Sequence, residues 1–262
     1  MSKMWPARGF AMLAAAFWVI FFFGYVDLLV PILRQPGFDS SYLLETGWGA
    51  MFVFLVGAPV VSAAFAPERM APQIEVALVG FAVGTIAVVV PEWRQLLPAA
   101  GLLLTSFVLA LLSGHTGIGL RPRAAMTAVG SGALNRVTLL LTVAASIPLT
   151  LYAADMVAGR REGRPPTDDI TIGLDHWPMQ AALAVAIVLT TGLASTNISG
   201  WPVPSWTSAV TVMWMGGFSV GYPTHAGSFG TVGGWAAIGW ACALAATTVL
   251  RHRSPEHASG SS

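Results

Sequence analysis

Acidic side chains near the ends of apolar segments are the first candidates for chemistry in this chain. Asp27 and Asp155 each lie about one helical turn before the end of a long apolar stretch. A charged group in hydrocarbon is costly unless it is paired or hydrated, so each acid is a candidate site for a proton or a cation. The alternative is structural, because either carboxylate could cap a neighbouring helix or pair with Arg34 or Arg160.

Two further acids, Glu45 and Asp175, stand where apolar segments begin. A carboxylate at the start of a helix accepts hydrogen bonds from free backbone N–H groups and complements the helix dipole. Capping is therefore a sufficient explanation for both residues. They nevertheless join Asp27 and Asp155 as candidates for binding a proton or a cation.

The segment Asp175-His176-Trp177-Pro178 places an acid beside an imidazole at a helix entrance, and His225 is expected on the same side of the membrane. Together with Asp155, these side chains could bind a metal ion through nitrogen and oxygen, or relay protons near neutral pH. His176 and Gln180 are four residues apart and share a helix face. The chain has no His-x-x-x-His pair, and a haem would need both histidines to bend inward. The cofactor is unknown, and the absence of a metal or haem is the favoured interpretation.

The elements that must position these residues are apolar segments long enough to cross a membrane, which takes about 20 residues. Eight segments qualify, and the breaks between them contain Pro, Gly and charged residues. The sequence therefore predicts an all-α polytopic membrane protein with about eight transmembrane helices. An amphipathic helix at the membrane surface is predicted over Ala124 to Leu134, in the 116–135 connection. The predicted spans are 9–32, 47–66, 73–91, 96–115, 136–157, 177–196, 203–222 and 227–250.

The composition supports this class and excludes others. The 262 residues are 55% hydrophobic and 10% charged, with a net charge of +1 and a mean hydropathy of +0.69. These values exclude a disordered chain, a basic nucleic-acid binder and a cytosolic enzyme. Cys242 is the single cysteine, and no Walker, Rossmann, Gly-x-Ser-x-Gly or Cys-x-x-Cys motif is present. An opsin-type Schiff base is excluded because the only lysine is Lys3.

The distribution of charge predicts the orientation in the membrane. With the N-terminus inside, eight basic residues face the cytoplasm and five face outward, whereas three acids lie inside and nine outside. We expect a bacterial plasma (inner) membrane, cytoplasmic N- and C-termini and an acidic vestibule that opens outward. On the inner side, Arg121, Arg123 and Arg136 could bind anionic lipid headgroups, although the positive-inside rule alone explains them.

Landmarks on the predicted outer face recur at about half the chain length, which suggests a tandem repeat. An even number of helices per half would give both halves the same orientation, as a parallel 4+4 duplication. The corresponding units are residues 1–131 and 132–252, followed by a solvated tail at 253–262. The paired landmarks are Asp27 with Asp155, Glu45 with Asp175, and Pro91 with Pro223.

Three classes of function remain open. The first is a small secondary carrier or permease for a proton, a cation or a small solute, with acids at the interface between the halves. The second is a non-catalytic accessory subunit of a larger membrane complex. The third is a membrane enzyme that binds a metal or haem through outer-face His and Asp side chains. The expected partners are the lipid bilayer and partner subunits or further copies of the chain, without nucleic acid.

Overall fold

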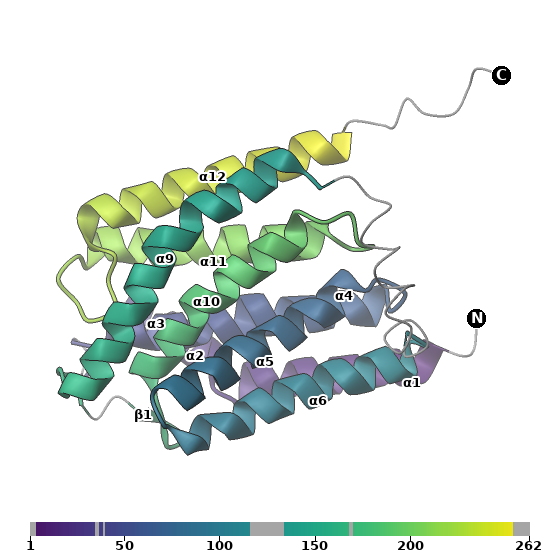
Figure 1. Ribbon diagram of the computed structural model, residues 1–262. Helices are drawn as coiled ribbons and strands as arrows, with labels where there is room; N and C mark the ends of the chain where they lie inside the picture. Colours follow the sequence, from purple (N-terminus) through teal and green to yellow (C-terminus); the bar gives the residue numbers. More distant parts are fainter. Residues whose placement is uncertain (1–3, 35–36, 39, 116–133, 168–169, 254–262) are drawn as a thin grey trace.

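The computed structural model describes residues 4–34, 37–38, 40–115, 134–167 and 170–253. Its long helices lie side by side along a common direction and form a single bundle (Figure 1). The described part of the chain is almost entirely helical, apart from one short pair of strands and the connecting turns. This confirms the all-α class. The predicted surface helix at Ala124 to Leu134 falls almost wholly outside the described residues.

The first apolar stretch is a broken helix. Helix α1 (Trp5–Ala16) continues into a π-helical turn, η2 (Phe17–Phe21), and α2 (Gly24–Leu33) restarts after a bend of 41°. Phe23 lies in the left-handed region, with φ of 59°, which ends one helix and begins the other.

The second stretch is also not a regular α-helix throughout. Helix α3 (Tyr42–Ala50) runs through a π-helical segment, η3 (Met51–Gly57), into α4 (Ala58–Phe65). The three elements form one candidate membrane span. The sequence predicted that this helix begins near Glu45, but it begins three residues earlier, at Tyr42, so Glu45 lies within its first turn instead of capping it.

The next two elements form an antiparallel pair. Helix α5 (Ala71–Val89) begins with Pro72 in its first turn, where the missing N–H costs no hydrogen bond. After the turn at Pro91, a short 3-10 helix η4 (Trp93–Gln95) leads into α6 (Leu96–Leu112).

The second half begins with α9 (Arg136–Glu162), which Asn135 caps by accepting a hydrogen bond from the backbone N–H of Thr138 at 2.8 Å. Strands β1 (Ile170–Thr171) and β2 (Leu174–Asp175) pair antiparallel, with Ile170 opposite Asp175. Helices α10 (His176–Ala194), α11 (Pro202–Gly221) and α12 (Gly230–Arg253) complete the bundle.

Within the described residues, six helices are long and apolar enough to span a membrane, and the bent pair formed by α1–η2 and α2 is a further candidate. Each of the eight predicted stretches coincides with a helix or a run of helices, but α11 is not among these candidates. Its sequence explains this, because α11 contains five Ser or Thr residues and three Gly residues. The chain thus has the architecture of a helical membrane protein.

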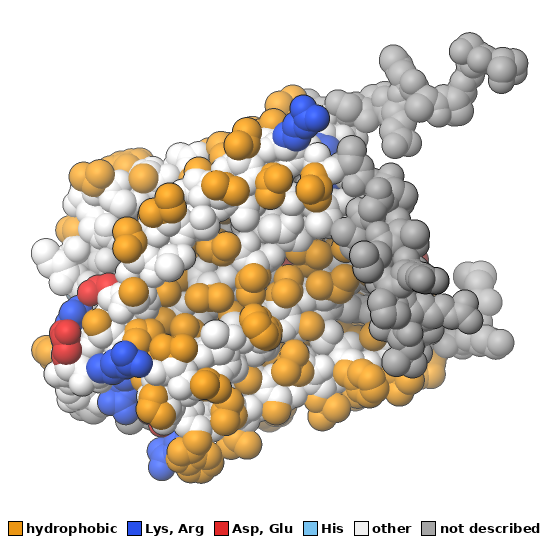
Figure 2. Space-filling model, in the orientation of Figure 1, with side chains coloured by type: hydrophobic (Ala, Val, Ile, Leu, Met, Phe, Trp, Pro, Cys, Tyr) orange, Lys and Arg blue, Asp and Glu red, His pale blue; other side chains and the backbone are white. Residues whose placement is uncertain are grey.

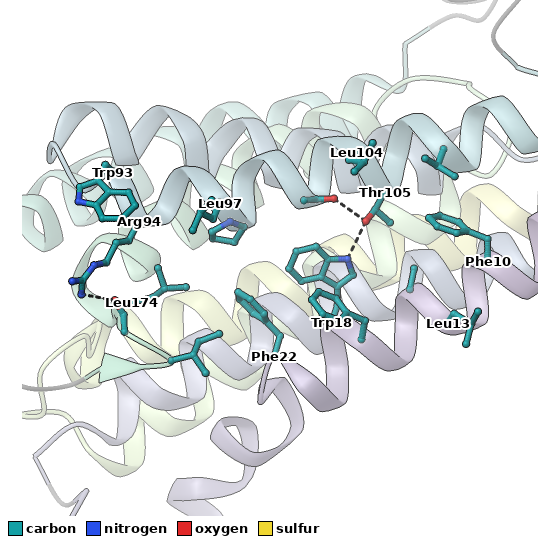
Figure 3. A pocket seen from close by; sticks show the side chains of 17 residues that line it. Phe10, Leu13, Trp18, Phe22, Trp93, Arg94, Leu97, Leu104, Thr105 and Leu174 are labelled. Atoms are coloured by element: carbon teal, nitrogen blue, oxygen red, sulfur yellow. Dashed lines mark hydrogen bonds between the residues drawn. The ribbon is translucent and has the colours of Figure 1, made fainter.

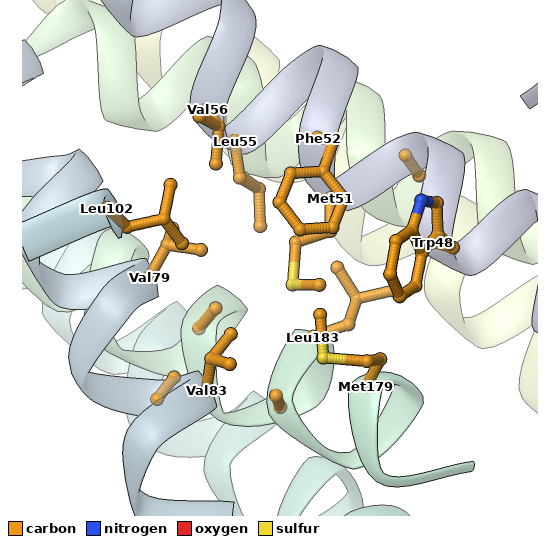
Figure 4. Packing of buried hydrophobic residues seen from close by; sticks show 14 of the residues in the cluster. Trp48, Met51, Phe52, Leu55, Val56, Val79, Val83, Leu102, Met179 and Leu183 are labelled. Atoms are coloured by element: carbon orange, nitrogen blue, oxygen red, sulfur yellow. The ribbon is translucent and has the colours of Figure 1, made fainter. Parts of the chain in front are cut away.

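The bundle has a clear centre. In the most apolar window of α10, 78% of residues are buried, against 22% in those of α9 and α12, so α10 is central and the other two are peripheral. Large side chains from α3, η3, α5, α6 and α10 fill the core (Figure 4). Hydrophobic side chains also cover the face shown in Figure 2. An apolar exterior is what a lipid-facing surface requires.

The two ends of the bundle differ. The beginning of α1 and the end of α12 lie at one end, which we call the terminal end (Figure 1). The connections from α2 to α3, α5 to α6, α9 to α10 and α11 to α12 lie at the other end. That second end carries charged side chains on the face shown in Figure 2, and we call it the polar end. It is marked by Glu92, Asp155, Arg160, Arg164 and Asp175.

Candidate functional site

Three buried side chains meet inside the polar end. Asp27 of α2, Glu45 of α3 and His176 of α10 each offer one potential ligand atom, and these atoms all lie within 4.8 Å of one another. The three residues are only 6%, 2% and 0% exposed. The Nδ1 atom of His176 is 3.7 Å from Oε1 of Glu45. We call these three residues the acid–histidine cluster.

Close contact between two backbones brings the two acids together. A Cβ atom added to Gly49 of α3 would lie 2.2 Å from the backbone nitrogen of Leu28 in α2, so only glycine permits this approach. The break before α2 contributes as well, since it restarts the helix with Asp27 in its first turn. The side chain of Thr46 also donates a hydrogen bond to the carbonyl oxygen of Leu28 at 3.1 Å, which ties α3 to α2 beside the cluster.

His176 is held in place as the first residue of α10. The Oδ1 atom of Asp175 caps this helix by accepting a hydrogen bond from the N–H of Trp177 at 2.9 Å. The other carboxylate oxygen lies 2.9 Å from Nε of Arg160, which also pairs with Glu92 at 3.1 Å. Burial raises the pKa of Asp175, and the Trp177 hydrogen bond and the Arg160 charge oppose that rise. Asp175 thus has the capping role that its position predicts.

Aromatic rings close one side of the cluster. The ring of Trp48 lies 4.9 Å from that of His176 and stacks on Phe22 at 5.3 Å. Its Nε1–H donates to the carbonyl oxygen of Phe22 at 3.0 Å, which satisfies a backbone group at the helix break. Electrostatic interactions are stronger in such an apolar setting than in water.

The short pair of strands lies against the acid of α2. Thr171 in β1 donates a hydrogen bond from its hydroxyl to Oδ2 of Asp27 at 3.3 Å. The turn between the strands has φ of 50° at Ile172 and 79° at Gly173, as in a tight two-residue hairpin. The hairpin therefore contributes a polar group to the cluster from the connection between the predicted spans 136–157 and 177–196.

A second group of polar side chains lies one helical turn further along α10. The amide of Gln180 donates to the hydroxyl of Tyr152 at 2.8 Å, and Tyr152 donates to the carbonyl oxygen of Gly227 at 2.6 Å. A Cβ atom on Gly47 would overlap the Gln180 side chain, at 1.7 Å from Oε1. This packing holds α3, α9 and α10 in register beside the cluster. Within the described residues, Oε1 of Gln180 has no hydrogen-bond partner.

The structure separates Asp155 from the site. Asp155 is exposed on α9 and pairs with Arg164 at 2.7 Å. The repeat predicted that Asp155 is the counterpart of Asp27, but the environments of the two carboxylates differ completely. Asp27 faces α3 and α10, whereas the face of α9 that carries Asp155 is directed outward.

The predicted metal ligands Asp175, His176 and His225 do not form a group together. Only His176 belongs to the one such cluster found among the described residues. His225 instead stacks on Tyr42 at 5.8 Å and meets Tyr222 edge-on at 5.0 Å. The carboxylate of Asp175 pairs with Arg160 instead.

The predicted lipid-binding arginines are only partly described. Arg121 and Arg123 lie outside the described residues, and Arg136 is exposed at the beginning of α9. The binding of anionic headgroups therefore stays a prediction.

An apolar groove lies between α1, α6 and the short hairpin (Figure 3). Its volume is about 840 Å³, and Arg94 is its one charged lining residue. Inside it, Trp18 donates to the hydroxyl of Thr105 at 3.2 Å, which in turn donates to the carbonyl oxygen of Gly101 at 2.8 Å. These hydrogen bonds satisfy the polar side-chain atoms of Trp18 and Thr105 within the pair of helices.

The acid–histidine cluster has a donor set that suits a cation. Two carboxyl groups and one imidazole supply oxygen and nitrogen ligands. The sequence marks Asp27 and Glu45 as proton or cation candidates and His176 as a metal candidate, but it does not bring the three together, since no spacing motif links α2, α3 and α10. Comparisons of the chain with protein-family models, curated proteins and solved structures gave no match.

Proposed function

We propose that this protein is a small secondary carrier that binds a cation at the acid–histidine cluster. The observation that carries the proposal is the convergence of Asp27, Glu45 and His176 from three helices, with potential ligand atoms within 4.8 Å of one another. Buried charges are stable only when they are paired or bound to a cation. A divalent metal ion would neutralise both carboxylates, whereas a proton or a small solute with one cationic group would neutralise one of them.

The helix break beside the cluster supports a carrier. Substrate and ion sites in secondary carriers are typically formed by discontinuous helices, because the interrupted backbone lines the site. Here the 41° bend between η2 and α2 directly precedes Asp27. The π-helical segment η3 lies on the same helix as Glu45, and such segments are frequent at functional sites.

We further propose eight membrane crossings in a bacterial plasma membrane, with both termini cytoplasmic and the polar end facing outward. The excess of basic residues on the terminal side supports this orientation. All five Ser and Thr side chains of α11 are buried, so in this arrangement they do not contact lipid. The units 1–131 and 132–252 would be the two halves of a parallel repeat, with the cluster made by α2 and α3 of the first and α10 of the second.

Cation binding can be measured by titrating the detergent-purified protein with Mn²⁺ or Zn²⁺ in a calorimeter. We expect about one ion per chain, and we expect Asp27→Asn, Glu45→Gln and His176→Ala to lose it. Asp155→Asn is the matched control, because it removes an exposed carboxylate from the same end of the bundle. Equal binding by the control and the three cluster variants would refute the site.

Transport is tested separately in proteoliposomes. Uptake of the same ion, or of protons reported by an entrapped pH dye, should be lost in Asp27→Asn and kept in Asp155→Asn. If the wild-type protein binds the ion but moves neither the ion nor protons, the carrier proposal fails and the site has another purpose.

An accessory subunit is the second candidate, and one observation favours it. A groove of about 370 Å³ lies between α9, α11 and α12, and its lining includes the small residues Ala144, Ala145, Gly233, Ala236 and Ala237. Small residues allow a partner helix to approach closely in a membrane. Co-purification of a defined complex in mild detergent would support this candidate. A metal-dependent membrane enzyme is the third, and it would need the same cluster to turn over a substrate.

A further inference from the structure

A second buried carboxylate lies near the terminal end of the bundle, far from the acid–histidine cluster. Glu75, near the beginning of α5, is 0% exposed. The hydroxyl of Thr207 in α11 donates a hydrogen bond to its Oε1 atom. Its Oε2 atom is buried and has no hydrogen-bond partner among the residues that the structure describes. This carboxyl group is not explained by helix capping or by surface solvation.

The helices around Glu75 supply no cation. The elements that pack most closely on α5 are α4, η3, α6, η4, α10 and α11. Their sequences contain only two titratable side chains, Arg94 in η4 and His176 in α10. Arg94 lies in the connection from α5 to α6 and His176 is the first residue of α10, so both belong to the polar end. The 19 residues of α5 span about 28 Å, so neither side chain reaches Glu75.

None of the described ionisable groups of the terminal end pairs with Glu75. Glu68 and Arg69 are exposed in the turn before α5, and His115 lies 3.0 Å from Oε1 of Gln73. Arg251 donates to the carbonyl oxygens of Ala194 and Thr196. A carboxylate held in an apolar interior without a cation is unstable, and the simplest remedy is a bound proton.

A line of polar groups leads from Glu75 towards the cluster. Thr207, Thr211 and Trp214 are spaced four and three residues apart, which places them on one face of α11. The hydroxyl of Thr211 donates to the carbonyl oxygen of Thr207 at 2.7 Å. At the far end of this line, Trp214 donates to the hydroxyl of Thr46 at 2.7 Å, and Thr46 is the neighbour of Glu45 in α3.

A second pair of hydroxyls accompanies the line. The side chains of Thr190 in α10 and Ser208 in α11 lie 2.8 Å apart in the buried interior. The distance along α11 from Thr207 to Trp214 is about 10 Å. The polar groups of α11 thus lie between Glu75 and the part of α3 that carries Glu45.

We propose that Glu75 is a proton-binding site of the carrier, separate from the cation site at the acid–histidine cluster, and that it holds a proton on its carboxyl group in the resting protein. This inference rests on the proposed carrier function and deepens it. The proton binds to a carboxylate oxygen and is released to water at the terminal end, which leaves the carboxylate charged. The polar face of α11, formed by Thr207, Thr211 and Trp214, connects Glu75 with the acid–histidine cluster, so that cation movement and proton movement are coupled.

Infrared difference spectroscopy of the protein in lipid tests the bound proton directly. At neutral pH the wild-type protein should show the C=O stretching band of a protonated carboxyl group. That band should be absent from Glu75→Gln and retained in Glu68→Gln, which removes the nearby exposed glutamate. The absence of the band in the wild type, or its persistence in Glu75→Gln, would overturn the proposal.

Thr207→Ala keeps the inference testable if Glu75→Gln does not fold. It leaves the carboxyl group in place but removes the hydrogen bond to Oε1, so the band should move to higher frequency. An unshifted band in Thr207→Ala would show that the protonated group is not Glu75, and would overturn the proposal.

Proteoliposomes separate this inference from the proposed function. Glu75→Gln should bind the cation at the cluster as the wild type does, but proton movement that accompanies cation uptake should be lost. If Glu75→Gln couples protons to uptake like the wild type, the inference about Glu75 fails while the cluster stands. If the wild type binds no cation, the carrier proposal fails, and the infrared band alone decides whether Glu75 holds a proton.

Discussion

The Oε1 atom of Glu45 lies 3.7 Å from Nδ1 of His176, although the two residues come from opposite halves of the chain. Both side chains are at most 2% exposed, and both are in the first turn of a helix. The pair exists because α3 and α10 pack against each other in the centre of the bundle. It makes the acid–histidine cluster a product of tertiary packing.

The hydrogen bond from Thr171 to Asp27 should tune cation affinity. Thr171→Val keeps the shape of the side chain but removes the donor, so the carboxylate loses one of the groups that orient it. Loss of a group that orients a ligand typically costs about 10-fold to 100-fold in metal affinity. Calorimetric titration with Mn²⁺ should show a decrease at the lower end of that range. Thr167→Val, in the loop before the hairpin, should leave affinity unchanged.

Gly49 should be intolerant of a side chain. Gly49→Ala would place a methyl group 2.2 Å from the backbone of Leu28, which forces α2 and α3 apart. We expect a loss of about 1–3 kcal/mol in stability, as for overpacked cores, together with loss of cation binding. Thermal unfolding in detergent measures the first effect. Gly217→Ala is the control, because nothing lies within 4 Å of a Cβ atom there; equal stability of the two variants would contradict the close packing.

Arg160 should stabilise the entrance of α10. Arg160→Ala removes the partner of Asp175 and of Glu92, and it leaves the buried Asp175 carboxylate without its cation. Because the Arg160 side chain is 39% exposed, we expect a loss of about 1–2 kcal/mol, below the value for a fully buried pair. Arg164→Ala removes a pair on the surface and should leave the melting temperature unchanged. A similar loss in both variants would argue against a special role for Arg160.

The same variant should show a characteristic dependence on pH. Burial already raises the pKa of Asp175 in the folded protein, and loss of the Arg160 charge raises it further. The folded state then holds this proton more tightly than the unfolded state, so the contribution of Asp175 to stability is present at low pH and is lost as pH rises through the folded pKa. The deficit of Arg160→Ala should therefore be larger at neutral pH than at mildly acidic pH. A deficit that does not change with pH would exclude Asp175 as its cause.

Tyr152 should hold Gln180 against α3. Tyr152→Phe removes a hydroxyl that accepts from Gln180 and donates to Gly227, and it leaves both groups without that partner. Loss of one member of such a buried pair costs about 1–3 kcal/mol. Tyr25→Phe, at a half-exposed position of α2, should have no comparable effect on thermal unfolding. Cation titration of Tyr152→Phe would show whether the position of Gln180 also affects the cluster.

The helices follow from the sequence because an apolar segment in a membrane must satisfy its own backbone hydrogen bonds. Eight apolar stretches therefore predict the positions of the helices within a few residues, and turn residues mark the breaks. The capping role of Asp175 also follows from the sequence, since an acid directly before a helix accepts hydrogen bonds from its first free N–H groups. The beginning of α3 was predicted three residues late. Ser41, a residue type that often caps helices, directly precedes Tyr42 and occupies the N-cap position, although its side chain makes no capping hydrogen bond.

The site, in contrast, was decided by tertiary structure. Asp27 and Asp155 occupy similar positions near the ends of apolar stretches, yet one is buried at the cluster and the other is exposed beside Arg164. In a membrane helix the lipid-facing and protein-facing sides are both apolar, so the sequence does not show which way a helix is turned. The same reason hid Glu75, which looks like one more charge near a helix end until its contact with Thr207 places it inside the bundle. Composition determined that the chain is a helical membrane protein, and only the packing of the helices decided which of its acids are buried.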